Sequence, residues 1–313
     1  MNNETYKYIF GPVTSRRLGI SLGIDLIPYK TCSLDCIYCE CGRTSDSTIE
    51  IKEHIPFEGL KDELTTYLNS NIKLDAITFA GSGEPTLHNR IGDVIAFLKE
   101  NYSEFKVVLL TNSTLFHHAY VRDRVIGADT IIASFDAASE NVFKKLNRPH
   151  KDLTLFKMKE GLLKLREEYQ NEMILEVFIV PGVNDSDDEL KKIKIFADSL
   201  GPESIQVNSM DRPGTCDWVK SVSKERLKEI ETFFGIDSMK FNHLKSTKNI
   251  SCKDIISEIL STIRRRPCTK SDLKKMTGQN TGVEKALEKL ISEDKIVLKK
   301  MPRGDFYYTK DRG

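Results

Sequence analysis

The sequence predicts an α/β protein in which a parallel sheet or barrel is followed by a small C-terminal domain of helices and a β-hairpin. Between residues 22 and 234, apolar strand-like runs alternate with helical patterns, as they do in parallel α/β folds. The strand-like runs carry Val, Ile, Leu and Phe on both faces, which is typical of buried parallel strands. After Gly235 the alternation stops and a different pattern begins.

Six strands are expected in the N-terminal part, with helices between and after them. The expected strands are Leu22–Ile27, Ala76–Ala80, Lys106–Thr111, Thr130–Phe135, Ile174–Val180 and Ser204–Asn208. The expected helices are Gly59–Asn69, Ile91–Asn101, His118–Ile126, Ser139–Leu146, Leu155–Gln170, Ser186–Leu200 and Ser223–Phe234. Because a closed barrel of this type needs eight strands, six strands predict an open sheet or an incomplete barrel.

The C-terminal segment has the pattern of a winged helix-turn-helix. Residues 237–250 are polar and without clear period, which predicts a linker between domains at 1–236 and 251–313. Helices are expected at Lys253–Arg265, after Thr269 and at Thr281–Ser292, and Asp272 lies where a capping box with Thr269 requires it. The strand-like runs 295–300 and 305–309 flank the turn 302–304, which predicts a hairpin.

Composition places the chain among ordinary globular proteins. It has 313 residues, 39% of them hydrophobic, and 47 basic against 46 acidic side chains. The apolar runs are too short to cross a bilayer, so no membrane association is expected. The N-terminus lacks the pattern of a secretory signal, and we therefore expect a cytoplasmic protein.

Charge is divided unevenly along the chain. Residues 251–313 carry 15 basic and nine acidic side chains, whereas the preceding residues carry 32 basic and 37 acidic ones. This asymmetry predicts two domains, the second of which faces a polyanion or an acidic partner. A solvated lysine-rich surface is the alternative explanation.

Four of the seven cysteines lie within ten residues, at Cys32, Cys36, Cys39 and Cys41. An odd number of cysteines without a secretory signal argues against a disulfide framework and favours metal binding. Three thiolates within eight residues can surround one corner of an iron–sulfur cubane and leave one iron without a protein ligand. The alternative is a zinc site completed by Cys41, although the Cys39-Glu40-Cys41 step makes simultaneous ligation awkward.

The spacing of Cys32, Cys36 and Cys39, with Tyr38 before the last cysteine, resembles the radical S-adenosylmethionine (SAM) superfamily. The resemblance covers about Ile9 to Phe234 and implies a partial (β/α)6 barrel with a [4Fe-4S] cluster on these three cysteines. It also implies that the open iron binds SAM. An electron from a donor of the flavodoxin or ferredoxin type would then split SAM into methionine and a 5′-deoxyadenosyl radical, which takes a hydrogen atom from the substrate.

The resemblance also implies SAM contacts at the strand ends. The segment Gly81-Ser82-Gly83-Glu84-Pro85 resembles the glycine-rich motif that binds the amino group of the methionine moiety. Ser134 would meet the SAM carboxylate, Asn112 or Asp136 the ribose or neighbouring loops, and Val180 the adenine through its backbone. Tyr38 would pack beside the cluster and the adenine. For the polar residues at strand ends, helix capping is the alternative role.

Two further segments, Phe10–Asp25 and Asn147–His150, resemble a subgroup described as wyosine-synthase-like, named for enzymes that build a tricyclic base in tRNA. Arg16 and Arg17 are therefore candidates for binding an anionic substrate, with surface or interdomain salt bridges as the alternative. Asn208 and Arg212, at and after the end of the sixth strand, are further candidate substrate contacts.

The winged-helix pattern favours a nucleic acid substrate, and tRNA is the leading possibility. Charge for phosphate contacts would come from Arg264–Arg266, Lys274, Lys275, Lys285, Lys289, Lys299, Lys300 and Arg303. We expect the three arginines to be largely solvated. We also expect SAM cleavage to survive removal of residues 251–313, because every expected SAM contact precedes Phe234. The alternatives are a peptide or protein substrate, and a non-enzymatic metal-containing regulator that binds DNA.

Overall fold

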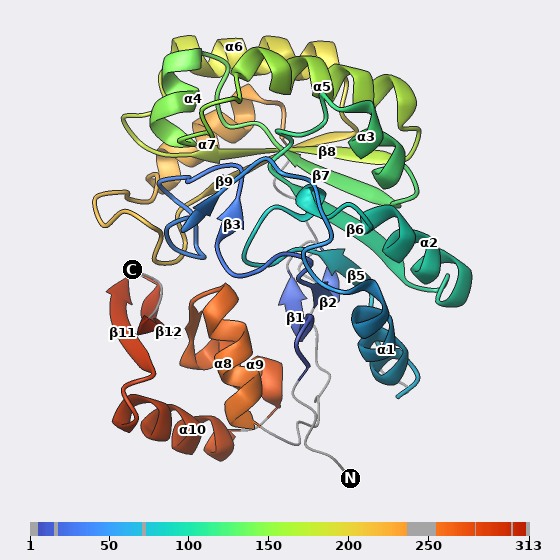
Figure 1. Cartoon of the computed structure of the whole chain (residues 1–313). Helices are drawn as coiled ribbons and strands as arrows, with labels where there is room; N and C mark the ends of the chain where they lie inside the picture. The colour runs from blue at the N-terminus through green and yellow to red at the C-terminus, as the bar shows by residue number, and fades with distance from the viewer. Residues whose placement is uncertain are drawn as a thin grey trace.

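A seven-stranded sheet forms the centre of the computed structural model, and a small C-terminal unit packs beside it (Figure 1). The structure describes residues 6–15, 18–70, 73–236, 255–278, 280–301 and 303–310. The predicted linker at 237–250 lies outside these residues, as do the candidate substrate contacts Arg16 and Arg17. None of the helices in the described part of the chain is long and apolar enough to span a membrane.

The sheet has the order β1-β2-β5-β6-β7-β8-β9. Its strands are β1 (Ile9–Ser15), β2 (Gly19–Ile24), β5 (Ala76–Phe79), β6 (Lys106–Thr111), β7 (Thr130–Ser134), β8 (Glu172–Ile179) and β9 (Ser204–Ser209). The strands from β2 to β9 pair in parallel, and all six were predicted. β1 pairs antiparallel to β2 and was not predicted. Its register shifts between Phe10 and Val13, around Pro12, and an edge strand tolerates a proline that a central strand does not.

The predicted helices between the strands are confirmed with small changes at their ends. They are α1 (Phe57–Leu68), α2 (Ile91–Asn101), α3 (Ala119–Val125), α4 (Glu140–Leu146), α5 (Leu155–Glu168), α6 (Asp187–Leu200) and α7 (Lys224–Phe233). A 3-10 helix, η1 (Pro85–Leu87), and the short pair β3 (Thr31–Cys32) and β4 (Asp46–Ser47) lie in the loops. Helix α2 packs against α3 and α5 against α6, and Figure 1 shows these helices on the outside of the sheet.

The sheet is apolar on both faces, as predicted. One face joins the helices in the main core, to which each of the five strands from β2 to β8 contributes a fully buried side chain, Leu22, Ile77, Leu109, Ile131 and Leu175. The opposite face holds a smaller buried cluster of Ala76, Val108, Ile132 and Ile174. The result is a mixed α/β fold with a parallel sheet, consistent with a partial barrel.

The described residues of the C-terminal unit form three helices and three short strands. They are α8 (Ile255–Arg265), β10 (Cys268–Thr269), α9 (Lys270–Thr277), α10 (Asn280–Ser292), β11 (Ile296–Met301) and β12 (Gly304–Thr309), with the sheet order β10-β12-β11. The predicted capping box is present, since the Thr269 side chain accepts from the Asp272 amide and the Asp272 side chain from the Thr269 amide. β10 was not predicted because two residues are too few to show a period.

The C-terminal unit packs against the N-terminal part through α8 and α9, which lie beside β1 (Figure 1). The hairpin contributes two further ion pairs, from Lys299 to Asp217 and from Arg303 to Asp211. The expectation that the three arginines are largely solvated is wrong for Arg265, whose side chain is 14% exposed and pairs with Asp25. Much of the basic charge expected to meet phosphate therefore serves contacts within the chain.

Candidate active site

The candidate site lies at the ends of the parallel strands, where the cysteine loop follows β2. Parallel strands place their carboxyl ends on one edge, so the segments after β5, β6, β7 and β8 converge there. Residues 31 and 32 form the short strand β3, which pairs with β4. The amide of Cys39 donates to the carbonyl of Cys36 at 3.1 Å, and this bond holds the loop in a tight turn.

Each of the three predicted cluster cysteines accepts a hydrogen bond from a different side chain. The nitrogen–sulfur distances are 3.5 Å from Asn112 Nδ2 to Cys32, 3.4 Å from Asn147 Nδ2 to Cys36 and 3.6 Å from Lys30 Nζ to Cys39. The three donors come from three segments, namely the end of β6, the end of α4 and the loop after β2. Hydrogen bonds to sulfur are one of the means by which proteins tune iron–sulfur clusters.

Lys30 is a site residue that sequence reasoning missed. It is buried, with 3% of its surface exposed, and its backbone has a positive φ of 62°. Burial opposes its charge, but the sulfurs of Cys39, Cys41 and Cys32 favour the ammonium form, so the pKa of Lys30 lies above its usual value. The only signal in the sequence is a lysine two residues before the first cysteine.

Burial opposes the charged form of two of the cluster thiols, Cys32 and Cys36. Burial raises the pKa of Cys32 to about 12 and that of Cys36 well above its usual value. Metal ligation requires the thiolate, so the cysteines lose their protons and become negatively charged when the metal binds. The neighbouring N–H donors then stabilise the charged sulfurs. The donor set therefore suits an iron–sulfur cluster held by Cys32, Cys36 and Cys39.

The zinc alternative finds no support in this geometry. Among the residues that the structure describes, no group of three or more His, Cys, Asp or Glu side chains could hold a single metal ion. Cys41 Sγ lies instead within hydrogen-bond reach of two backbone carbonyl oxygens, 2.9 Å from that of Arg265 and 3.3 Å from that of Gly81, which share its single S–H hydrogen.

The glycine-rich loop after β5 packs directly against the cysteine loop. A Cβ at Gly81 would lie 2.3 Å from the carboxyl of Asp25, and a Cβ at Gly83 would lie 2.2 Å from the carbonyl oxygen of Thr31. The amide and hydroxyl of Ser82 donate to the Asp25 carboxylate at 3.3 Å and 3.0 Å. These contacts, all within the chain, explain why the loop needs small residues.

Glu84 holds the loop to the end of β6. Its carboxylate is 2% exposed and accepts from the amide and hydroxyl of Thr86, the hydroxyl of Thr111 and the amide of Asn112, at 2.6–3.1 Å. Burial raises the pKa of Glu84, and the four donors oppose that shift. Because its oxygens are already bonded, the Glu84 side chain supports the loop from within.

Asp136 supports the aromatic residue of the cysteine loop. Its buried carboxylate accepts from Asn147 Nδ2 at 2.9 Å, from the Phe178 amide at 2.8 Å and from the Tyr38 hydroxyl. Burial raises the pKa of Asp136 to about 6. The Tyr38 ring stacks on Phe178 with centroids 4.0 Å apart and planes 8° apart. Asp136 thus orients both Tyr38 and the donor to Cys36.

The remaining predicted residues lie around the same edge of the sheet. Ser134 is partly buried at the end of β7, and the buried Val180 belongs to the small apolar cluster that also contacts Tyr38. Asn208 is partly buried in β9. Arg212 is 14% exposed and pairs with Glu40 at 3.3 Å, while its Nε is buried without a hydrogen-bond partner among the described residues.

The radical SAM superfamily model matches residues 26–193, a segment that contains the cysteine loop and the strands from β5 to β8. The match covers more than half of the sequence, and the chain therefore belongs to the radical SAM superfamily.

Two relatives extend the similarity to nearly the whole chain. The UPF0026 protein MJ1312 of Methanocaldococcus jannaschii is 30% identical over 309 residues, which are 96% of this chain and 95% of that protein. The GTPase Obg of Brachyspira hyodysenteriae is 32% identical over 299 residues, which are 93% of this chain. The chain spans 43% of the length of that second protein.

Solved structures share the fold at low sequence identity. A radical SAM methyltransferase from Sphaerobacter thermophilus superposes with a TM-score of 0.51 at 18% identity, over 69% of this chain and 64% of that one. The enzyme anSMEcpe with bound AdoMet superposes with a TM-score of 0.51 at 17% identity, over 68% of this chain and 57% of that one. Family membership makes the chain an enzyme with a [4Fe-4S] cluster and SAM as its cofactors.

Proposed function

We propose that this enzyme cleaves SAM reductively and uses the resulting 5′-deoxyadenosyl radical to take a hydrogen atom from a nucleic acid, with tRNA as the leading candidate. Cys32, Cys36 and Cys39 would hold the cluster, which supplies the electron when reduced by a flavodoxin- or ferredoxin-type donor. The observation that carries the cluster assignment is the set of three N–H donors, one for each of these sulfurs.

The SAM contacts in this proposal surround the cysteine loop. Gly81, Ser82 and Gly83 would present their backbone to the methionine moiety, while Glu84 holds their loop in place through its four hydrogen bonds. Val180 lies in the apolar cluster against which Tyr38 packs, and this surface suits the adenine ring. Asn112, whose amide donates to Glu84, and Ser134 at the end of β7 would complete the site.

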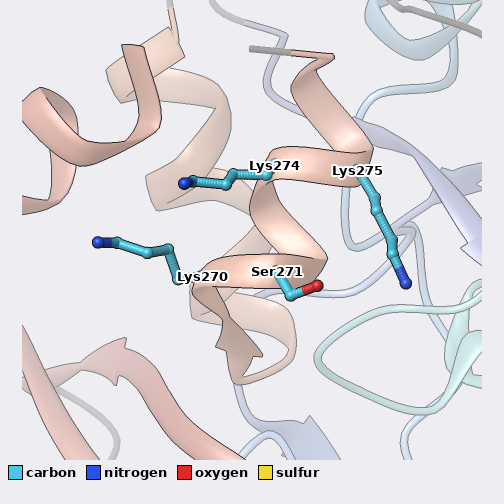
Figure 2. A pocket seen from close by; sticks show the side chains of 4 residues that line it. All are labelled: Lys270, Ser271, Lys274 and Lys275. Carbon is cyan, nitrogen blue, oxygen red and sulfur yellow. The ribbon is translucent and has the colours of Figure 1, made fainter. Parts of the chain in front are cut away.

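The substrate assignment rests on charge. The order of helices and strands in the C-terminal unit supports the proposal of a winged helix-turn-helix, and helix-turn-helix folds read nucleic acid. Lys270, Ser271, Lys274 and Lys275 line a hollow of about 420 Å³ on α9, and Figure 2 shows Lys270 and Lys274 extending to the same side. Both lysines share Glu284, at 3.1 Å and 3.0 Å, so the hollow keeps an excess of positive charge.

Arg212, in the loop after β9, is a second candidate contact for an anionic substrate. Its guanidinium pairs with Glu40 next to Cys39, and its buried Nε has no partner among the described residues. An unpartnered buried donor is costly, so an acceptor on a bound substrate would stabilise it.

The cluster assignment is tested by single cysteine variants reconstituted anaerobically. Wild type should be brown, contain about four irons per chain and form 5′-deoxyadenosine from SAM when reduced. Cys32→Ala, Cys36→Ala and Cys39→Ala should each lose cluster and cleavage. Cys41→Ala is the matched control from the same loop and should retain both, because Cys41 bonds to backbone carbonyls. A colourless protein loaded with zinc would contradict the assignment.

The substrate assignment is tested by titrating tRNA at several salt concentrations. Binding through phosphate should weaken steeply as salt rises. The triple variant Lys270→Ala, Lys274→Ala, Lys275→Ala should weaken it further. A matched triple variant of Lys144, Lys145 and Lys151, exposed on the N-terminal part, should have little effect. Binding that is undetectable or independent of salt would favour a peptide or protein substrate instead.

A further inference from the structure

Arg265, the last residue of α8, joins the C-terminal unit to the candidate SAM loop. Its Nε donates to Asp25 Oδ2 at 2.7 Å. The two side chains are 14% and 7% exposed, so the ion pair is largely shielded from water. They are separated by 240 positions in the sequence, and each belongs to a different unit of the fold.

The guanidinium of Arg265 is held from two further directions. Its Nη1 donates to the carbonyl and hydroxyl oxygens of Ser261, at 3.1 Å and 2.8 Å. Its plane lies over the ring of Phe10, 4.8 Å from the centroid. That ring in turn occupies the space above Gly23, where a Cβ would lie 2.2 Å from it. Phe10 and Asp25 thus hold the guanidinium of Arg265 between them.

Asp25 also contacts the glycine-rich loop. Its carboxylate accepts from the amide and the hydroxyl of Ser82 and lies against the Cα of Gly81. A second link runs through Cys41, whose Sγ lies between the carbonyl oxygens of Arg265 and Gly81, 2.9 Å and 3.3 Å away. One residue of α8 is therefore connected twice to the loop proposed to bind the methionine moiety of SAM.

Removing the guanidinium would leave a buried carboxylate without its counter-charge. Such a group is strongly disfavoured, so it must move, admit water or take up a proton. Each of these responses changes the acceptor on which Ser82 depends. Because Gly81 packs directly on the carboxyl group, a shift of Asp25 also displaces the backbone of the loop.

We propose that Arg265 is a positioning residue for SAM, so that the C-terminal unit is a structural part of the SAM site as well as a candidate substrate-binding module. This inference rests on the proposed role of Gly81–Gly83. It replaces the expectation from sequence that SAM cleavage survives removal of residues 251–313, because that deletion would take Arg265 away from Asp25.

The test titrates SAM into full-length, cluster-loaded protein by calorimetry, after iron content and thermal unfolding have been measured for each variant. Arg265→Met should raise the Kd for SAM about tenfold, the loss of one charge-assisted hydrogen bond. Arg265→Lys should recover much of this loss. Arg264→Met is the matched control from the same helix turn, since Arg264 is exposed and its guanidinium lies over Tyr29.

A second variant keeps the inference testable where Arg265→Met loads little iron. Asp25→Asn removes the charge that Arg265 compensates, and Arg265→Met in the Asp25→Asn background should weaken SAM binding no further. A Kd for Arg265→Met within twofold of wild type would overturn the inference, as would equal losses in Arg265→Met and Arg264→Met. Wild-type protein that loads iron but binds no SAM would instead overturn the proposed function itself.

Discussion

The ammonium group of Lys30 lies 3.6 Å from Cys39 Sγ, and its replacement by Met should make the cluster harder to reduce. Reduction adds negative charge, and a nearby positive charge favours that change. At this separation and an effective dielectric constant of about 20, the interaction of two unit charges is about 5 kcal/mol. For a one-electron couple this corresponds to about 200 mV.

The expected shift is smaller, because the added electron is shared over a cluster that extends away from Cys39. Doubling the mean distance halves the interaction, so Lys30→Met should lower the midpoint potential by about 100 mV. The burial of Lys30 keeps solvent screening weak at this position.

The assay is a redox titration of the reconstituted cluster, followed by electron paramagnetic resonance, after iron content has been matched between variants. Lys30→Arg keeps the charge and should remain near the wild-type potential. Lys52→Met removes an exposed lysine and should change nothing. A midpoint for Lys30→Met within 20 mV of wild type, on the order of a third of one tenfold step, would refute the electrostatic reasoning.

Three further predictions concern stability. Gly83→Ala places a Cβ 2.2 Å from the Thr31 carbonyl oxygen, so it should cost about 3 kcal/mol and reduce iron loading. At Gly182 nothing lies within 4 Å but φ is +71°, so Gly182→Ala should cost only about 1 kcal/mol through backbone strain and leave the loading unchanged. Thermal unfolding and iron content of the two variants check this, and equal effects would contradict it. Glu84→Gln turns an amide toward hydrogen-bond donors and should lower the free energy of unfolding by about 2 kcal/mol, measured by denaturant titration, with the exposed Glu50→Gln as a control without effect. Glu258 concerns pH. Burial raises its pKa to about 7, so the native state holds this proton more tightly than the unfolded chain does, and the contribution of this group to stability should fall as pH rises from about 4.5 to 7. The loss attributable to this group is at most about 3 kcal/mol, and Glu258→Gln should remove it. Parallel stability curves for the two proteins across this range would contradict the prediction.

Local patterns in the sequence predicted most of the fold. The period of apolar residues located the six parallel strands and the helices between them, because burial against neighbouring layers requires that period whatever the partners are. The same holds for the capping box at Thr269, which involves residues three positions apart. β1 was missed because its proline and irregular register remove the local signal.

The cysteine spacing also predicted the class of cofactor, since three ligands within eight residues act as one local unit. What surrounds those ligands depends on pairs that are distant in the sequence. Asn112 and Cys32 are 80 positions apart, and Asn147 and Cys36 are 111 apart. Their hydrogen bonds exist only because the parallel strands bring their carboxyl ends to one edge of the sheet.

Tertiary structure alone decided what the basic residues of the C-terminal unit do. From sequence, Arg264–Arg266 are three equivalent charges at a helix end. In the folded protein, Arg265 differs from its neighbours because it pairs with Asp25 and lies over the ring of Phe10. Arg303 likewise pairs with Asp211. A charge in a sequence has no assigned partner until packing removes its water and brings an opposite charge within reach, and that step depends on how the two units meet.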